Sequence, residues 1–369
     1  MSVPICTVAL TIRAIKSVAV DVPMTYPLGT SAARLRSAPL LLIDVETEEG
    51  VTGHAYLFCY VAAAAKAMAA MLDDIAMAVK GERVAPIDLW EKLSKRYRLI
   101  GAQGIVRMAM AGVDVACWDA LAIAADKPLV DLLGGGGQRK IPAYNSCGLG
   151  IMTPDAAADE AEKLLASGFR AVKLRLGYAT LEGDLAAVRA VRKRLPDDVH
   201  LMTDYNQALS VAEAIRRGRA LDDEGVYWIE EPIRHDDYEG NARIARELKT
   251  PLQIGENFSL AQAMQVSLAA NASDFVMPDL ERIGGVTGWM RAAALASAHG
   301  IEMSSHLFPE TSAHLLAVTP TRHWLEYVDW AAPILAEPLV IVDGNAVIGE
   351  RPGTGVSWSA DAVNRLRMA

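Results

Sequence analysis

The segments LMTDYNQ (201–207), WIEEP (228–232) and QIGEN (253–257) each place an acidic residue at the end of a short apolar run. These residues, Asp204, Glu230 and Glu256, follow one another at equal intervals of 26 residues. Repeated units of one strand and one helix give regular spacing of this kind. The sequence therefore predicts three consecutive βα units, each with a carboxylate at the end of its strand.

The same alternation of apolar runs with amphipathic helical stretches extends in both directions from these units. Eight such runs predict a closed barrel of parallel strands. We therefore expect an α/β fold, a modified TIM barrel of the (β/α)7β type, in which the last helix is missing or altered. The predicted strands are 141–146, 171–176, 200–204, 228–230, 252–255, 275–277, 301–304 and 324–327, and helices are predicted between them at 153–167, 181–195 and 210–223.

Four consecutive glycines, Gly134 to Gly137, mark the strongest boundary in the chain. Residues 1–134 are predicted to form an α+β capping domain, because strand-like segments come first and helical segments follow. Residues 135–328 would form the barrel. The tail, residues 329–369, is expected to return to the cap and complete it, with a strand near 338–342. Within the cap, the strands are predicted at 8–22, 40–46 and 51–58, the helices at 62–79, 88–97 and 103–125, and a mobile loop at 23–37.

The bulk composition argues against several classes of partner. The formal net charge of −9 leaves no basic excess to neutralise phosphates, so no nucleic-acid partner is expected. The four cysteines form no CxxC pair, which argues against a zinc site and fits a reducing cytoplasm. The most apolar helical stretches, 61–72 and 108–125, contain charged residues, and the first residues lack the pattern of a signal peptide. We therefore expect a cytoplasmic protein with no membrane partner.

The carboxylates of Asp204, Glu230 and Glu256 are the first candidate site. Reactive residues of such barrels lie at the carboxyl ends of the strands, so these side chains should converge. Converging carboxylates repel one another unless a cation lies between them, and ligands that are all oxygen suit Mg²⁺. The alternative is three unrelated surface acids at the starts of loops. Glu231, beside Glu230, would face the other side of its strand and support the site from behind.

Polar residues also occupy other predicted strands. Lys173 and Arg175 in AVKLRLG share one face of their strand, and they either act in the barrel mouth or form salt bridges with the acids. Asp279 in VMPDLERIGG and His306 in MSSHLF end neighbouring strands, so the carboxylate is placed to hold the imidazole and raise its basicity. Glu326 in WLEYVD either donates a hydrogen bond to a developing oxyanion or is a plain rim acid.

This set of residues resembles the mandelate racemase subgroup of the enolase superfamily, and the resemblance covers nearly the whole chain. It is specific enough to place the chain near the member that gives the subgroup its name. Besides the strand ends already quoted, the similar segments are GHAYLFCY (53–60), VDVACWDAL (113–121), GFRAVKLRLGY (168–178), HDDYEG (235–240), MPDLERIGGVTGW (277–289), SAHLLA (312–317) and HWLE (323–326).

The resemblance implies a role for each site residue. The three carboxylates would bind Mg²⁺, and the ion together with Lys173 would neutralise the carboxylate of a small 2-hydroxy acid. His306, oriented by Asp279, would be an acid/base, and Glu326 would donate a hydrogen bond to the other carboxylate oxygen as the enediolate forms. The resemblance also implies a homo-oligomer. The remaining substrate contacts that it implies are Asn206, Ser146, Phe58, Tyr60 and Leu307.

Two features depart from the pattern of the family. Arg175 stands where the name-giving member has a lysine that serves as the base opposite the histidine, and arginine does not readily give up its proton. Arg34 and Arg36 occupy a stretch of the cap that is largely apolar in that member. We therefore expect these two arginines to contact a polar or anionic group at the far end of the substrate.

The expected activity is Mg²⁺-dependent removal of the α-proton of a 2-hydroxy carboxylate through an enediolate, leading to racemisation. The alternative is an acid-sugar dehydratase with His306 as its sole acid/base, because Arg175 removes the second base. A third class is a non-catalytic protein that binds carboxylates, against which the intact metal ligands and the Asp279–His306 pair argue.

Overall fold

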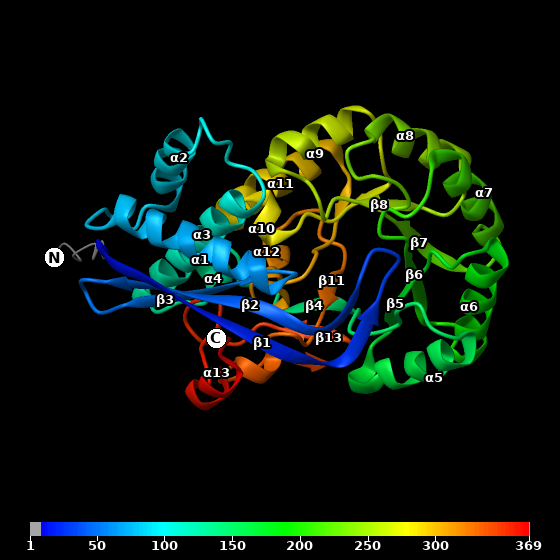
Figure 1. Cartoon of the computed structure of the whole chain (residues 1–369), viewed down its shortest axis with the longest axis horizontal. Helices are drawn as coiled ribbons and strands as arrows, with labels where there is room; N and C mark the ends of the chain where they lie inside the picture. The colour runs from blue at the N-terminus through cyan, green and yellow to red at the C-terminus, as the bar shows by residue number, and fades with distance from the viewer. Residues whose placement is uncertain (1–8, 369) are drawn as a thin grey trace.

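The computed structural model describes residues 9–368 and divides them into a cap and a barrel, which lie side by side in Figure 1. Val8, where the first strand was predicted to begin, and Cys6 lie outside the described residues. The other three cysteines are free and buried. Among residues 9–368, no helix combines the length and the apolar character that crossing a bilayer requires.

The parallel strands of the barrel follow one another in sequence order from β4 (Lys140–Asn145) to β10 (Glu302–Met303). The last strand, β11 (Leu325–Tyr327), pairs with β4. Backbone hydrogen bonds from Ser305 N to Trp324 O at 3.0 Å and from His323 N to Met303 O at 2.9 Å join the last two strands and close the ring. A short 3-10 turn at Ala332–Ile334 follows β11 in place of an α-helix, so the predicted (β/α)7β fold is confirmed. The strands are β4 (Lys140–Asn145), β5 (Ala171–Arg175), β6 (His200–Asp204), β7 (Val226–Glu230), β8 (Leu252–Ile254), β9 (Phe275–Val276), β10 (Glu302–Met303) and β11 (Leu325–Tyr327).

Helices cover the outside of the ring, as Figure 1 shows. The amphipathic ones bury their apolar faces, as α7 does with Ala214, Gly218 and Leu221. The helices are α5 (Pro154–Leu164), η1 (Ala166–Gly168), α6 (Leu181–Arg194), α7 (Val211–Leu221), α8 (Tyr238–Glu247), α9 (Leu260–Ala269), α10 (Leu280–Ile283), α11 (Gly285–His299) and α12 (Pro309–Ala317).

The strand register sets polar side chains side by side at one end of the barrel. Arg175 at the end of β5 is the register partner of Asp204 at the end of β6. Asp204 is in turn the partner of Glu230 at the end of β7. Because parallel strands present their carboxyl ends at the same edge, these three residues face one region.

The cap combines an antiparallel sheet with helices packed on it. The long helix α3 (Ile105–Ala124) is buried on nearly all sides. Its two acidic residues, Asp114 and Asp119, accept hydrogen bonds from residues outside the cap. Asp114 accepts a hydrogen bond from Thr287 N of α11 at 2.9 Å, and Asp119 accepts one from Thr354 Oγ1 of the tail at 2.8 Å. The elements are β1 (Ile12–Gly29), β2 (Arg34–Thr47), β3 (Thr52–Phe58), α1 (Ala62–Val79), α2 (Pro86–Arg96), α3 (Ile105–Ala124) and α4 (Leu129–Leu132).

The prediction of a mobile loop at residues 23–37 is wrong. Strands β1 and β2 continue through most of this stretch, with Leu28 paired to Leu35 and Gly29 to Arg34. The tip of the hairpin is held on the barrel by Ile151 N, which donates to Gly29 O at 2.7 Å, and by Ser31 Oγ, which donates to Tyr205 O at 2.8 Å. The apolar residues of this stretch lack a clean alternation because part of the hairpin packs on the barrel instead of on the cap.

The strand predicted near 338–342 forms but does not return to the cap. Strand β12 (Val340–Val342) pairs with β13 (Asn345–Val347), and β13 pairs antiparallel with β4 of the barrel. Later parts of the tail do contact the cap. Trp358 Nε1 donates to Asp44 of β2 at 2.7 Å, and helix α13 (Ala360–Leu366) lies beside β1 in Figure 1.

Candidate active site

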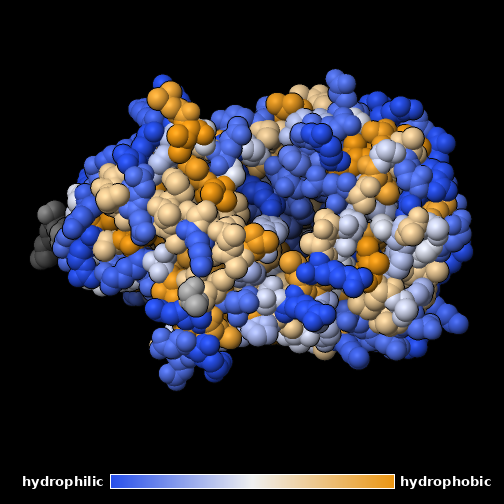
Figure 2. Space-filling view, viewed as in Figure 1, coloured by the Kyte–Doolittle hydropathy of each residue, from blue (hydrophilic) through white to orange (hydrophobic). Residues whose placement is uncertain are grey.

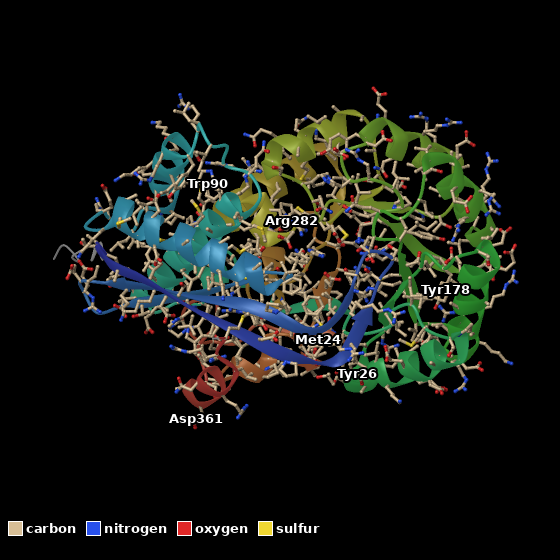
Figure 3. The ribbon with its side chains drawn as sticks, viewed as in Figure 1. Met24, Tyr26, Trp90, Tyr178, Arg282 and Asp361 are labelled. Carbon is tan, nitrogen blue, oxygen red and sulfur yellow. The ribbon has the colours of Figure 1, made fainter. Side chains whose placement is uncertain are left out.

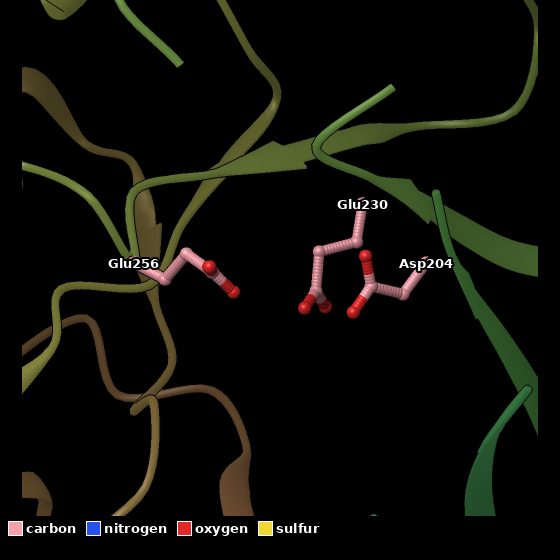
Figure 4. A group of neighbouring side chains, drawn as sticks. All are labelled: Asp204, Glu230 and Glu256. Carbon is pink, nitrogen blue, oxygen red and sulfur yellow. The ribbon is translucent and has the colours of Figure 1, made fainter. Parts of the chain in front are cut away.

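Three carboxylates from neighbouring strands meet at the carboxyl end of the barrel. Asp204 and Glu230 end β6 and β7, Glu256 follows β8, and one oxygen from each lies within 4.8 Å of the others (Figure 4). Glu230 is fully buried and accepts hydrogen bonds from Trp228 Nε1 at 3.1 Å and Gln253 Nε2 at 3.3 Å. Burial raises the pKa of Glu230 to about 8, with Lys173 opposing the rise and Asp204 adding to it.

This donor set fits Mg²⁺. It consists of carboxylate oxygens alone, the ligands that hard divalent cations prefer. Burial and the neighbouring carboxylates raise the pKa of Glu230, which means that its negative charge is costly there, and a divalent ion would offset that cost.

Lys173 connects the carboxylates to the other side of the site. Its side chain is buried, and Nζ lies 2.5 Å from Glu230 Oε1, 2.8 Å from Glu326 Oε1 and 3.6 Å from Asp204 Oδ2. Burial lowers the pKa of Lys173, but Glu230, Glu326 and Asp204 together raise it above its usual range. Lys173 is therefore a positive charge inside the barrel mouth. The ion pairing predicted as one alternative is present, and its role toward a substrate stays a prediction.

His306 and Asp279 form the expected pair. His306 Nδ1 lies 2.7 Å from Asp279 Oδ2, so the carboxylate fixes the orientation of the ring. The other oxygen of Asp279 accepts from the N–H groups of Glu281 and Arg282, at 2.9 and 3.0 Å, at the start of α10. Nε2 of His306 points toward the carboxylates, 3.3 Å from Glu256 Oε2. Burial lowers the pKa of His306, but Glu256, Glu326 and Asp279 outweigh it and raise the pKa to about 9.

Both Nη atoms of Arg175 donate to the protein itself, while its Nε is buried without a partner among the described residues. Nη1 donates to the carbonyl oxygens of Ser146 at 3.1 Å and Gly148 at 2.8 Å, and Nη2 donates to Ser146 Oγ at 2.7 Å. Ser146 Oγ donates in turn to Glu326 Oε1 at 2.7 Å. Arg175 thus orients Ser146 and, through it, Glu326.

Glu326 receives several donors at once. Lys173 and Ser146 contact one oxygen, and Leu307 N donates to the other at 2.9 Å. Burial raises the pKa of Glu326, but Lys173, His306 and Arg175 outweigh it and hold the pKa well below its usual range. This arrangement favours an ionised carboxylate over the neutral hydrogen-bond donor that the sequence had indicated.

A pocket of about 330 Å³ lies over these groups, between the cap and the barrel mouth. Asn206 lines it and donates from both its backbone N and its Nδ2 to Asp204, at 2.8 and 3.0 Å, while its Oδ1 is buried and has no partner among the described residues. The sequence-predicted residues that line the pocket are Phe58, Tyr60, Lys173, Arg175, Asp204, Asn206, Glu256, His306, Leu307 and Glu326.

The predicted contacts of Arg34 and Arg36 with the substrate are not supported. Both residues are exposed, whereas Leu35 between them lines the pocket. Alternate residues of a strand face opposite sides, so once Leu35 faces the pocket the two arginines face away. The prediction had treated this strand as a loop.

Sequence reasoning missed several further lining residues, among them Asn257, Arg282 and Trp330. Asn257 Nδ2 donates to Glu231 at 2.9 Å and to Glu256 at 3.2 Å. Arg282 Nη1 donates to Glu256 O at 2.9 Å. A signal existed for the first two, because Asn257 directly follows Glu256 in QIGEN and Arg282 lies three positions after Asp279 in VMPDLERIGG.

Comparison with family models covers most of the chain. Residues 12–134 match the N-terminal domain of mandelate racemase/muconate lactonizing enzymes, and residues 156–362 match the enolase C-terminal domain-like model. Among curated proteins, the L-talarate/galactarate dehydratase of Salmonella typhimurium is 32% identical over 89% of this chain and 82% of its own. The 3,6-anhydro-alpha-L-galactonate cycloisomerase of Streptomyces coelicolor is 34% identical over 89% of this chain and 91% of its own.

The solved structures that resemble this chain include metal-bound proteins. An enolase from Bradyrhizobium complexed with magnesium and mandelic acid is 41% identical, with a TM-score of 0.94 over 98% of this chain and 100% of that one. The crystal structure of the Salmonella dehydratase with magnesium and L-lyxarohydroxamate has a TM-score of 0.92 at 28% identity, over 100% of this chain and 96% of that one. Together with the carboxylate triad, these matches identify the chain as an enzyme and Mg²⁺ as its cofactor.

Proposed function

Since the chain belongs to the mandelate racemase/muconate lactonizing enzyme family of the enolase superfamily, we propose that it is a Mg²⁺-dependent dehydratase of a 2,3-dihydroxy carboxylate of the sugar-acid type. The observation that carries the proposal is the asymmetry of the site. His306 Nε2 faces the substrate region on one side, and the group expected as a second base, Arg175, is bonded to Ser146 and Gly148.

The proposed reaction needs only one acid/base. When bound, Mg²⁺ supplies positive charge at the substrate carboxylate, which makes the neighbouring α-proton more acidic. His306 takes that proton at Nε2 while Asp279 holds Nδ1, and Lys173 neutralises charge that develops on the carboxylate oxygens. The protonated His306 then gives the proton to the departing 3-hydroxyl group. Water leaves, and the resulting enol converts to a 2-keto-3-deoxy acid.

A hydroxylated substrate is supported by Asn206. Its Oδ1 is buried without a partner among the described residues, and a buried acceptor left unpaired is costly. A substrate hydroxyl would satisfy it. The relatives that are a dehydratase and a cycloisomerase of sugar-derived acids support the same class.

Racemisation is the second candidate. Two observations favour it. The pocket has an apolar wall, formed by Leu28, Leu35, Phe58, Leu307 and Trp330. The similar Bradyrhizobium protein was crystallised with mandelic acid. The curated relatives give it no support, and it requires a proton donor on the face that Arg175 occupies.

The test is a panel of four- to six-carbon sugar acids and both mandelate enantiomers, incubated with enzyme and Mg²⁺ in D₂O and followed by NMR. A 2-keto-3-deoxy product from at least one sugar acid supports dehydration. Interconversion of the mandelate enantiomers without a keto acid supports racemisation. A protein that exchanges no α-proton of any compound would be a non-catalytic relative.

Two further predictions belong to the proposal. We expect a homo-oligomer, which light scattering coupled to gel filtration would measure, and a cytoplasmic location, which fractionation of the source cells would test.

A further inference from the structure

A second pocket, of about 530 Å³, lies beside the active site where the cap meets the barrel. It is formed by the start of α3, the loop after β7 and the loop after β8. Figure 2 shows a hydrophilic hollow between cap and barrel, and Figure 3 places Arg282 at this junction. Asn257 and Arg282 line both pockets. The reaction proposed above uses none of the other residues that line the second pocket.

Two guanidinium groups line this pocket without a carboxylate partner. Arg107, in the first turn of α3, is partly buried and donates to Ser259 Oγ. Arg282 donates to Glu256 O and to Tyr60 OH. Neither arginine forms an ion pair with any carboxylate in residues 9–368. Burial lowers the pKa of Arg107, and no acidic group offsets that effect. Burial also lowers the pKa of Arg282, but Tyr60, Asp279 and Glu256 outweigh it and raise the pKa. An anion beside Arg107 would therefore lower the free energy of the site.

The other lining groups do not cancel this positive charge. Asp236 lies in the pocket wall, but Arg234 holds its carboxylate with two hydrogen bonds of 3.0 and 2.6 Å. His235 also lines the pocket and is partly buried, and its backbone N donates to Gln207 Oε1 at 3.0 Å. Helix α3 starts at Gly104 with no capping side chain and no acidic residue in its first turn, which adds to the preference for an anion.

Arg282 connects this pocket to the active site. Its Nη1 holds the backbone oxygen of Glu256, the third carboxylate of the triad, at 2.9 Å. Its Nη2 reaches Tyr60 of the cap, and its guanidinium lies 5.1 Å from the centre of the Tyr60 ring. An occupant that contacts Arg282 would therefore affect both the position of Glu256 and the closure of the cap on the barrel.

We propose that the pocket between Arg107 and Arg282 is a second binding site, for the carboxylate or phosphate group of a small anion. The anionic group comes from one of two sources. It is either the far end of a dicarboxylate substrate whose reacting end lies over the metal ligands, or a separate ion whose binding alters turnover. The first source rests on the proposed dehydratase function, and the second does not.

Binding is measured without turnover, by titrating inorganic phosphate into the full-length Mg²⁺-loaded enzyme in a calorimeter. We expect saturable binding that Arg107→Gln weakens at least about fivefold, because a charge-assisted hydrogen bond is lost. Arg98→Gln is the matched control, since Arg98 is exposed, close in sequence and outside the pocket. Equal affinity in all three proteins, or no saturable binding, would overturn the proposal, and neither result depends on which reaction the enzyme catalyses.

The two sources are then separated by steady-state kinetics on a sugar monocarboxylate and a sugar dicarboxylate that the enzyme accepts. If the substrate's far carboxylate occupies the site, Arg107→Gln raises KM for the dicarboxylate alone. If a separate ion occupies it, added phosphate changes KM for both substrates in the wild type and for neither in Arg107→Gln. If neither the variant nor added phosphate changes the kinetics, the pocket has no part in substrate binding or in the regulation of turnover.

Discussion

The guanidinium of Arg175 donates to the hydroxyl of Ser146 at 2.7 Å, and this hydroxyl donates to Glu326 at the same distance. A base opposite His306 would have to release its proton toward the substrate. The Nη atoms of Arg175 instead donate to Ser146 and to the carbonyl groups of Gly148 and Lys173, and arginine does not readily release a proton. Under the proposed function, His306 is therefore the mobile proton carrier, and Arg175 is a fixed cation where the resemblance implies a second base.

The first prediction is that proton exchange is one-sided. In D₂O with Mg²⁺, the wild type should exchange the α-proton of only one enantiomer of a 2-hydroxy acid, the one that presents it to His306 Nε2. His306→Asn should abolish exchange, because no other base faces that position. NMR of each enantiomer separately measures both rates. Comparable exchange of the two enantiomers by the wild type would show that a second base operates.

The second prediction concerns the contact between Ser146 and Glu326. Ser146→Ala removes the link from Arg175 to Glu326 but leaves the backbone hydrogen bonds of Arg175 in place. We expect kcat to fall about tenfold, equivalent to roughly 1.4 kcal/mol for one lost buried hydrogen bond. Cys147→Ala, at the next position, is the control and should stay within about twofold. If both variants behave alike, Glu326 does not depend on Ser146 for its position.

The third prediction is loss of metal binding in Glu230→Gln. Glu230 is the most buried of the three carboxylates, and the substitution removes one negative charge while keeping the shape. We expect Mg²⁺ affinity to fall at least about tenfold, with turnover lost and the circular dichroism spectrum unchanged. Glu302→Gln, at the start of β10 and far from the triad, should bind Mg²⁺ normally. Full activity of the wild type in excess EDTA would contradict the metal assignment.

The fourth prediction distinguishes the two faces of the cap hairpin. Leu35→Asn places a polar group in the pocket and should raise KM about tenfold, as expected for a lost apolar contact. Arg34→Ala and Arg36→Ala change exposed residues and should alter KM less than about twofold. Steady-state kinetics on the best substrate of the panel measures all three. A larger effect from either arginine would mean that the hairpin turns its other face to the substrate.

The strands and the carboxylates could be predicted from the sequence because both depend on local patterns. A parallel strand buried on both faces reads as an apolar run, and βα repetition fixes which end of it faces the mouth. Asp204, Glu230 and Glu256 follow directly from those two rules, and the structure brings their oxygens together.

The partners of individual side chains could not be predicted in the same way. Whether Arg175 faces the substrate or the carbonyls of Ser146 and Gly148 depends on the path of the loop after β4. The pattern of apolar and polar residues in the sequence does not predict that path. The cap hairpin was missed for a related reason. Its strands extend past the cap sheet and rest on the barrel through Gly29 and Ser31, so tertiary contacts stabilise a stretch whose own pattern is weak.

The last prediction concerns stability at the opposite end of the barrel, where His323 lies in an aromatic cluster. Its ring is 4.6 Å from that of Phe275 and 5.8 Å from that of Trp228, and Tyr227 OH lies 2.9 Å from Nε2. Burial, with a smaller contribution from the charge of His200, lowers the pKa of His323 to about 4. The only carboxylate of the described residues recorded near it is the exposed Glu302, at 4.0 Å.

In the unfolded chain the imidazole of His323 should titrate near its usual value of about 6.5. Because the pKa in the folded protein is the lower one, the unfolded state binds the proton more readily. The contribution of His323 to stability is therefore complete above about pH 6.5 and is lost as the pH falls toward about 4. Between pH 7 and pH 5 the loss should be about 2 kcal/mol, and His323→Gln should lack that part of the pH dependence. Urea denaturation at the two pH values, compared between wild type and variant, isolates this residue from every other titrating group. If the free energy of unfolding falls equally in both proteins, His323 is not the group that couples folding to protons in this range.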